Sequence, residues 1–417
     1  MAPSRADIAL LFGSRAVRLF CYGFLSVILA LYLVEVGFSS RDVGLLFTFT
    51  LLGDAGISLW LTTSADRAGR RRTLLVGAAL MIVAGVVFIL TRQPAILMAA
   101  AIIGVISPSG NEIGPFLSVE QAALTQLVAD ERRTHTFAWY NLAGSLATAT
   151  GALSGGWLAQ TLQHGGLSTL ESYRMVLLGY SLGGGLLCLI FLALSPAVEV
   201  RVRPETSSVR RTLGLHKSRG VVARLSALFA LDAFAGGFII QSMMAYWFHL
   251  RFGVSEAVLG GIFFVANILA GISALLAARI AARIGLIRTM VFTHLPSNLL
   301  LCLVPLMPTL PSAALVLFLR FAISQMDVPT RQSYTMAVVA PDERSAASGV
   351  TTIARSLGAS ISPALSGALL GTTLAAPFFL AGGLKIVYDL LLYRSFQSVR
   401  PPEEQTSNLR SEVGNVR

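Results

Sequence analysis

The chain has 417 residues, of which 54% are apolar and 13% are Asp, Glu, Lys or Arg, whereas charged residues make up about 25% of an ordinary soluble domain. With a mean hydropathy of +0.71, this composition excludes a water-soluble fold and an intrinsically disordered chain. A net charge of +11 would favour nucleic acid in a soluble protein, but the basic residues here cluster between apolar runs. We therefore expect a lipid bilayer, and no nucleic acid, as the partner.

Long apolar runs recur along the chain between charged or Pro/Gly-rich breaks. Only helices satisfy their own backbone in so many separate membrane segments. The pattern therefore predicts an all-α membrane protein with about twelve transmembrane helices, each of roughly 20 residues or more. The expected spans are 12–35, 43–65, 73–91, 95–128, 134–161, 174–195, 222–248, 256–278, 288–307, 312–339, 345–371 and 377–397.

The basic residues predict the orientation. Alternate loops carry most of the Arg residues, and the side that holds them is the expected cytoplasmic side. An even number of spans then places both termini in the cytoplasm. We expect a multi-pass protein of the cell membrane, either a plasma or an inner membrane.

An internal repeat divides the chain into two halves. Asp130-Glu131-Arg132 recurs as Asp342-Glu343-Arg344, and Ala152-Leu153-Ser154-Gly155 recurs as Ala364-Leu365-Ser366-Gly367, both at an offset of 212 residues (342 − 130 and 364 − 152). Such a repeat predicts two pseudo-symmetric six-helix halves with a substrate path between them. The expected domains are a first half (1–195), a cytoplasmic basic linker (196–221), a second half (222–397) and a cytoplasmic tail (398–417).

A short charged loop follows the second span. It reads Asp66-Arg67-Ala68-Gly69-Arg70-Arg71-Arg72, with Gly for a tight turn and a basic cluster that can hold two helices together by charge pairing. This loop closely resembles the signature loop of the major facilitator superfamily, and a weaker copy stands at 283–288. The resemblance implies a transporter fold, with Asp66, Arg67, Gly69, Arg70 and Arg71 as a cytoplasmic gate.

The fifth span contains a glycine pattern similar to that of proton-coupled drug exporters in this family. Ala152 stands where those exporters have Pro, and the span 95–128 has none of the Arg they tend to carry. Small residues let another helix approach closely. We expect helix packing, or alternatively a hinge, at Gly144, Gly151, Gly155 and Gly156.

Ionisable groups inside the spans of the first half are functional candidates, because each is costly unless it is paired or faces water. Glu112 stands in a Pro/Gly-broken segment and is a candidate for proton coupling or substrate binding, or for a static hydrogen bond to the broken backbone. Glu120 either shares this role or pairs with an Arg of another helix. Arg18 could line an inner vestibule, whereas Arg15 is expected to extend to the surface. Asp54 is expected to pair with an Arg or to carry a proton.

The second half has its own set of ionisable residues. Arg320, Asp327 and Arg331 are spaced by seven and four, so an ideal helix would point all three to nearly one side and pair Asp327 with Arg331. Arg320 then needs a carboxylate from another span or an anionic group of a substrate. Arg320 and Asp327 are both candidates for proton coupling, substrate binding or gating. Asp232 has the same two alternatives as Asp54. Lys385 and Asp389 are expected to pair with each other across one turn.

These patterns predict a secondary transporter that exports small molecules by alternating access, with protons as the expected coupling ion. The alternative is a transporter of an organic or inorganic anion, because Arg18, Arg320 and Arg355 exceed what a cationic-drug site needs. A transport-inactive sensor is a weaker alternative. No catalytic residues, metal site or cofactor are expected, since the five His residues form no metal-ligand pair and no phosphate-cradling loop is present. We expect a monomer.

Overall fold

The computed structural model describes residues 5–112, 114–199 and 215–397, and within these ranges the ordered elements are helices. The helices up to residue 198 are α1 (Arg5–Ser26), α2 (Leu29–Val36), α3 (Ser40–Ala68), α4 (Arg70–Leu90), α5 (Pro94–Ile103), α6 (Phe116–Leu127), α7 (Asp130–His164), α8 (Thr169–Ala193) and the short η1 (Pro196–Val198).

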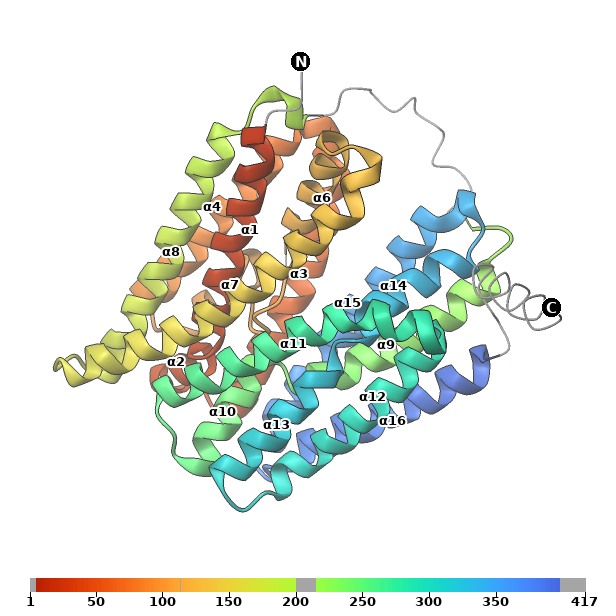
Figure 1. The fold of residues 1–417 in the computed structure, drawn as a ribbon. Coiled ribbons are helices and arrows are strands. Elements are labelled where there is room, and N and C mark those ends of the chain that lie inside the picture. The colour runs from red at the N-terminus through yellow and green to blue at the C-terminus, as the bar shows by residue number, and fades with distance from the viewer. Residues whose placement is uncertain (1–4, 113, 200–214, 398–417) are drawn as a thin grey trace. The chain divides into compact units, whose positions relative to one another are not determined.

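The remaining described residues continue the helical pattern (Figure 1). They form α9 (Arg219–Gly237), α10 (Gln241–Phe252), α11 (Glu256–Ile284), α12 (Leu286–Leu303), η3 (Val304–Leu306), α13 (Leu310–Ser324), α14 (Asp327–Val338), η4 (Pro341–Glu343), α15 (Arg344–Leu370) and α16 (Ala376–Phe396). The predicted all-α membrane fold is confirmed.

Nine helical segments in the described part of the chain are long and apolar enough to cross a membrane. Every predicted span coincides with helix, but four of them are interrupted and consist of α1 with α2, α5 with α6, α9 with α10, and α13 with α14. The fourth span is broken by a segment, 104–115, whose described residues (104–112 and 114–115) are irregular and include Pro108, Pro115 and two glycines with positive φ, Gly110 and Gly114. The count of twelve spans and the position of the termini stay predictions.

By its internal contacts the chain forms two compact units, each of which we describe by itself. Unit 1 comprises Met1–Glu205, Phe238–Ile268 and Ser360–Pro377, and unit 2 comprises Thr206–Gly237, Leu269–Ala359 and Phe378–Arg417. Both units therefore combine segments that are distant in sequence. The predicted division into two six-helix halves rests on the sequence repeat and stays a prediction.

Glycines allow α7 to lie directly against α1 in unit 1. A Cβ at Gly151 would be 2.1 Å from the carbonyl oxygen of Phe20, and one at Gly155 would be 2.1 Å from that of Phe24. At Gly156 the same distance separates a Cβ from the carbonyl oxygen of Glu256, and at Gly144 a Cβ would meet Leu19. All four glycines thus stand at close approaches, as the packing interpretation expects, while the hinge role stays a prediction.

Unit 2 has an aromatic and aliphatic core shared by α9, α12, α14 and α16. Its buried members include Phe229, Met290, Tyr334, Tyr388 and Leu392. This core holds the four helices that carry most of the buried charges described below. It therefore fixes their side chains in place.

Candidate functional site

Two arginines on α1 bind two glutamates of the interrupted fourth span in unit 1. Arg18 Nε lies 2.6 Å from Glu112 Oε1, and Arg15 Nη1 lies 2.9 Å from Glu112 Oε2. Arg18 also holds Glu120 with both terminal nitrogens, at 2.7 and 2.8 Å. We call these four side chains the α1 charge cluster, and its formal charges cancel.

Arg18 and Glu120 of the α1 charge cluster are shielded from water and well supplied with hydrogen bonds, whereas Glu112 is partly exposed and Arg15 Nε makes no hydrogen bond in the described structure. Arg18 and Glu120 have fully buried side chains. Ser14 donates a hydrogen bond of 2.7 Å to Glu120, which also accepts one from the Tyr140 hydroxyl. A buried ion pair is stable only when such extra donors satisfy it. Glu120 therefore pairs with an Arg of another helix, one of the two interpretations that its sequence position allowed.

The expectation that Arg15 extends to the membrane surface is wrong. Its residue is 7% exposed, its guanidinium stacks on the Tyr140 ring at 4.3 Å, and Asn141 accepts a hydrogen bond from it at 3.2 Å. Pairing with the Glu112 carboxylate is more favourable for Arg15 than extension to the membrane surface, because opposite charges attract strongly inside the protein. Sequence alone did not show that Glu112 lies beside this turn of α1.

Asp54 on α3 differs from these glutamates in having no cation. Its Oδ1 accepts the backbone N–H of Gly114 at 2.7 Å and the hydroxyl of Ser58 at 3.2 Å. Among the described residues, no basic side chain forms an ion pair with it. The alternative that Asp54 pairs with an Arg is thus not what the described structure contains.

Asp232 on α9 is the centre of a second group of charges, in unit 2. Lys385 Nζ lies 2.5 Å from its Oδ1, and Arg331 Nη1 and Arg355 Nη1 lie 3.0 and 3.3 Å from its Oδ2. His294 Nε2 is 3.9 Å from Oδ1. A single buried carboxylate therefore contacts cations from α14, α15 and α16, and its one negative charge is shared among them.

The neighbouring carboxylates extend this group. Asp327 binds Arg331 at 2.9 Å, the pairing that the spacing of four predicts. Lys385 and Asp389 do not pair with each other: Asp389 instead accepts hydrogen bonds from His294 at 2.8 Å and Asn298 at 2.9 Å. That expectation is wrong because the one-turn rule describes pairs on the exposed surface of a helix. Lys385 is instead attracted more strongly by the buried carboxylate of Asp232, since charges attract strongly inside the protein.

Arg320 on α13 is buried close to this group without a carboxylate partner. Its residue is 7% exposed, its Nε makes no hydrogen bond, and its guanidinium lies 4.9 Å from the ring centroid of Phe321. Asp232 and Asp327 act on it electrostatically but do not form an ion pair with it in the described structure. The helix also breaks at Gln325 and Met326, between Arg320 and Asp327, so the three residues do not form the continuous stripe that an ideal helix predicts.

We call Asp232, Asp327, Asp389, Arg320, Arg331, Arg355 and Lys385 the Asp232 cluster. It has three carboxylates against four cations, and His294 adds a further positive charge when it is protonated. Arg355 is partly exposed, but Arg320 is buried, and burial of an unpaired charge is costly unless a counter-charge is supplied. The Asp232 cluster is therefore suited to an anionic group that comes from outside the protein.

The loop between α3 and α4 is held by a residue that sequence reasoning missed. Glu199 accepts the backbone N–H groups of Arg70 and Arg71 at 2.8 and 3.2 Å and so caps α4. Gly69 turns the chain with φ +99°, and Arg70 donates to Gln126 at 3.1 Å. The side chains of Asp66 and Arg67 lie outside the described residues. The gate function of the loop stays a prediction.

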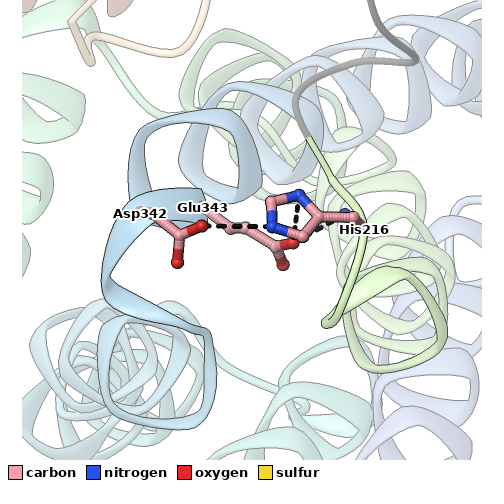
Figure 2. Close-up of side chains that lie close together, drawn as sticks. All are labelled: His216, Asp342 and Glu343. Carbon is pink, nitrogen blue, oxygen red and sulfur yellow. Dashed lines mark hydrogen bonds and ion pairs between the residues drawn. The ribbon is translucent and has the colours of Figure 1, made fainter.

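Figure 2 shows His216 between the carboxylates of Asp342 and Glu343, where the chain enters α9 and α15. Its Nδ1 lies 2.9 Å from Glu343 and its Nε2 lies 3.1 Å from Asp342. Burial raises the pKa of Glu343, but the backbone N–H groups of Lys217, His216 and Ser218 outweigh it and lower this pKa to about 2. These three side chains are close enough to hold a metal ion. Since Glu343 already accepts three backbone N–H groups, its role in the described structure is to cap α9.

The sequence contained weak signals for some of these residues and none for others. His294 lies inside an apolar run, four residues before Asn298, and this pattern is a signal for a buried polar site. Glu199 and Lys385 had no signal, because their partners are 129 and 153 residues away. Arg355 was recognised only as one of several intramembrane arginines.

The family model for the Major Facilitator Superfamily matches residues 11–363. The chain therefore belongs to this family: it is a multi-pass membrane protein with the fold of a secondary transporter of small molecules, and this family assignment indicates a transporter and not an enzyme. Along its sequence it is 30% identical over 423 residues to the uncharacterized membrane protein YJR124C of Saccharomyces cerevisiae, covering 94% of each chain.

Solved structures share this fold at low sequence identity. The nucleoside transporter NupG is 14% identical with a TM-score of 0.71, covering 94% of this chain and 99% of that one. A D-xylose–proton symporter is 13% identical with a TM-score of 0.72, covering 94% and 98%. The human organic anion transporter MFSD10 is 17% identical with a TM-score of 0.62, covering 94% and 100%. Their different substrates mean that the fold alone does not select one.

Proposed function

We propose that this protein is a proton-coupled secondary transporter of a small organic anion, with Arg320 and the Asp232 cluster as the anion-binding part. The observation that carries the proposal is a buried arginine without a carboxylate partner inside a cluster that has more cations than carboxylates. An anionic group on the substrate would supply the missing counter-charge. The guanidinium of Arg320 has the planar donor geometry for a carboxylate or phosphate.

The alternative prediction of anion transport is thus favoured over export of a cationic or neutral drug. Of the three arginines behind it, Arg18 no longer contributes, because Glu112 and Glu120 neutralise it. Arg320 and Arg355 remain, and Arg355 is the weakest partner of Asp232, with a side chain 34% exposed. These two residues are therefore the arginines with which an anionic group of the substrate could pair.

A matched screen tests this proposal. The purified protein is heated with pairs of compounds that differ in their anionic groups, such as benzoate and benzamide, succinate and succinamide, or glycerol phosphate and glycerol, with tetraethylammonium as a cation. We expect stabilisation by anionic members only, and its loss in Arg320→Gln. An exposed arginine of α11 gives the control, since Arg279→Gln should leave stabilisation unchanged. Stabilisation by neutral or cationic members that survives Arg320→Gln would overturn the proposal.

Export as the direction of transport and protons as the coupling ion belong to the same proposal. The direction of transport is tested with vesicles of known orientation. When the medium on the non-cytoplasmic side of the protein is made acidic, an exporter that exchanges protons for substrate should move substrate away from the cytoplasmic side. Accumulation on the cytoplasmic side under that gradient would instead identify a symporter.

A further inference from the structure

Asp54 stands apart from the other carboxylates in the spans. Glu112, Glu120 and Asp232 each bind at least one arginine or lysine. Asp54 binds a backbone N–H and a hydroxyl, both through Oδ1, and its Oδ2 accepts no hydrogen bond from the described residues. An ionised carboxylate inside a membrane span is costly without a cation, and a bound proton removes that cost.

Two buried carboxylates, Asp7 and Glu256, also form no ion pair among the described residues, but their environments differ. Both lie in the first turn of a helix, α1 and α11 respectively, where the positive end of the helix dipole favours a negative charge. Glu256 also accepts hydrogen bonds from Tyr173 at 2.5 Å and Gln163 at 3.0 Å. Asp54, in contrast, lies near the middle of α3, away from either helix end. Asp389 likewise binds no arginine or lysine, but His294 lies 2.8 Å from it. Among these carboxylates, Asp54 therefore has neither a basic side chain nor a helix end to compensate its charge.

The partner of Asp54 connects it to the α1 charge cluster. Gly114 belongs to the irregular segment 104–115, and Glu112 of the same segment binds Arg15 and Arg18. Tyr180 and Ser242 donate hydrogen bonds to the carbonyl oxygens of Val105 and Pro108 in the first part of the segment. Its last part is held at two points two residues apart, by Asp54 from α3 and by the arginines from α1. A change at one point alters the strain on the other, because the segment has little regular backbone hydrogen bonding of its own.

We propose that Asp54 is the residue that binds the transported proton and that it acts by releasing Gly114. A hydrogen ion adds to Oδ2 and forms one O–H bond, so the carboxylate becomes a neutral carboxylic acid and no other bond breaks. The hydrogen bond from Gly114 to Oδ1 then loses its charge assistance, and charge-assisted hydrogen bonds are roughly twice as strong as neutral ones. Segment 104–115 is loosened as a result. This inference rests on the proposed function and assigns its coupling site.

The groups that face Asp54 are few. Glu112 of the irregular segment and Tyr22 of α1 interact with it electrostatically. Of the helices packed against α3, α5 has no titratable residue and α4 has none over 74–90, whereas α6 carries Glu120, which Arg18 binds, and α2 carries Tyr32 and Glu35.

Hydrogen exchange of segment 104–115 in the purified full chain tests the proposal without a substrate. After correction for the intrinsic pH dependence of exchange, we expect wild-type protection of this segment to decrease from mildly alkaline to mildly acidic buffer. Asp54→Asn, which mimics the neutral acid, should show low protection at both pH values. Ser58→Ala keeps the carboxylate and should keep the pH dependence.

Two results would overturn the proposal: pH-independent protection in the wild type, or an unchanged pH dependence in Asp54→Asn. If Asp54→Asn does not fold, Asp54→Glu provides the test, because it keeps a titratable group and must keep the pH dependence with a shifted midpoint. These outcomes do not depend on which substrate is transported.

A vesicle experiment separates this proposal from the proposed function. Benzenesulfonate is permanently ionised and does not cross a bilayer as a neutral acid, so its exchange at equal pH reports anion transport alone. Asp54→Asn should keep wild-type exchange and lose accumulation driven by a pH gradient at least tenfold. Accumulation equal to the wild type would contradict the role of Asp54. Absence of wild-type exchange would count against anion transport, and the hydrogen-exchange result would then decide the proton site.

Discussion

Arg18 and Glu120 form a bidentate ion pair of 2.7 and 2.8 Å in which both side chains are completely buried. Such a pair is expensive to desolvate, and the structure recovers this cost through the second carboxylate, Glu112, and the hydrogen bond from Ser14. The α1 charge cluster therefore fixes α1 against the interrupted fourth span. Its charge balance makes it a structural element as well as a neighbour of the proposed proton site.

Breaking this pair should destabilise the protein strongly. Glu120→Gln leaves Arg18 with less counter-charge, and removal of one partner of a buried pair costs about 3–5 kcal/mol. The double variant Arg18→Met/Glu120→Met removes both charges and should recover more than half of this loss. Thermal unfolding in detergent measures both. A double variant as unstable as the single one would show that the pair is not the source of the stability.

The close packing of α7 on α1 predicts opposite effects of two glycine substitutions. Gly151→Ala places a Cβ 2.1 Å from a backbone oxygen and should destabilise the protein by about 1–3 kcal/mol through overpacking. Gly185→Ala on α8 meets nothing within 4 Å and should be neutral or stabilising by up to about 1 kcal/mol. Thermal unfolding of the two variants side by side is the measurement. Equal effects would contradict the close approach.

The sequence predicted helices and spans well, and ion pairs only where they are local. Periodicity and apolar runs located every helical span because they depend on neighbouring residues, and the Asp327–Arg331 pair followed from their spacing of four. The pairing of Arg15 with Glu112 and of Lys385 with Asp232 could not be predicted, because they join residues 97 and 153 positions apart. The break after Ser324 was also missed. Pro329 lies in the first turn of α14, where proline is tolerated, so it indicated a bend but not its position.

Asp232 should be essential because three cations depend on it. Asp232→Asn leaves Lys385, Arg331 and Arg355 with less counter-charge, and we expect loss of stability and of transport. A second substitution, Lys385→Gln, removes the cation at 2.5 Å and should restore part of the thermal stability. Arg279→Gln in the same background is the control and should restore nothing. If Lys385→Gln and Arg279→Gln both restored thermal stability, the net charge of the protein, and not the contact between Lys385 and Asp232, would account for the effect.

The cap that Glu343 provides to α9 predicts a defined pH dependence. The folded state lowers the pKa of this carboxyl to about 2, from an ordinary value of about 4.5, so its stabilising effect is complete above the ordinary value and is lost as pH falls towards 2. The difference in thermal stability between wild type and Glu343→Gln should therefore be largest near neutral pH and shrink below about pH 4.5. A difference that stays constant down to about pH 2 would contradict the ionised cap.

The central claim is that Arg320 binds an anionic group of the substrate. The most direct test measures uptake of benzoate and of benzamide, after subtraction of passive uptake by protein-free vesicles, by vesicles that contain wild type, Arg320→Gln, Arg320→Lys or the control Arg279→Gln. A charge-assisted hydrogen bond contributes about 1.5–3 kcal/mol, which corresponds to roughly 10–100-fold in affinity. We predict that the wild type and Arg279→Gln take up benzoate and not benzamide, that Arg320→Gln weakens benzoate uptake by that factor, and that Arg320→Lys restores part of it. Equal benzoate uptake by the wild type and Arg320→Gln would contradict the account.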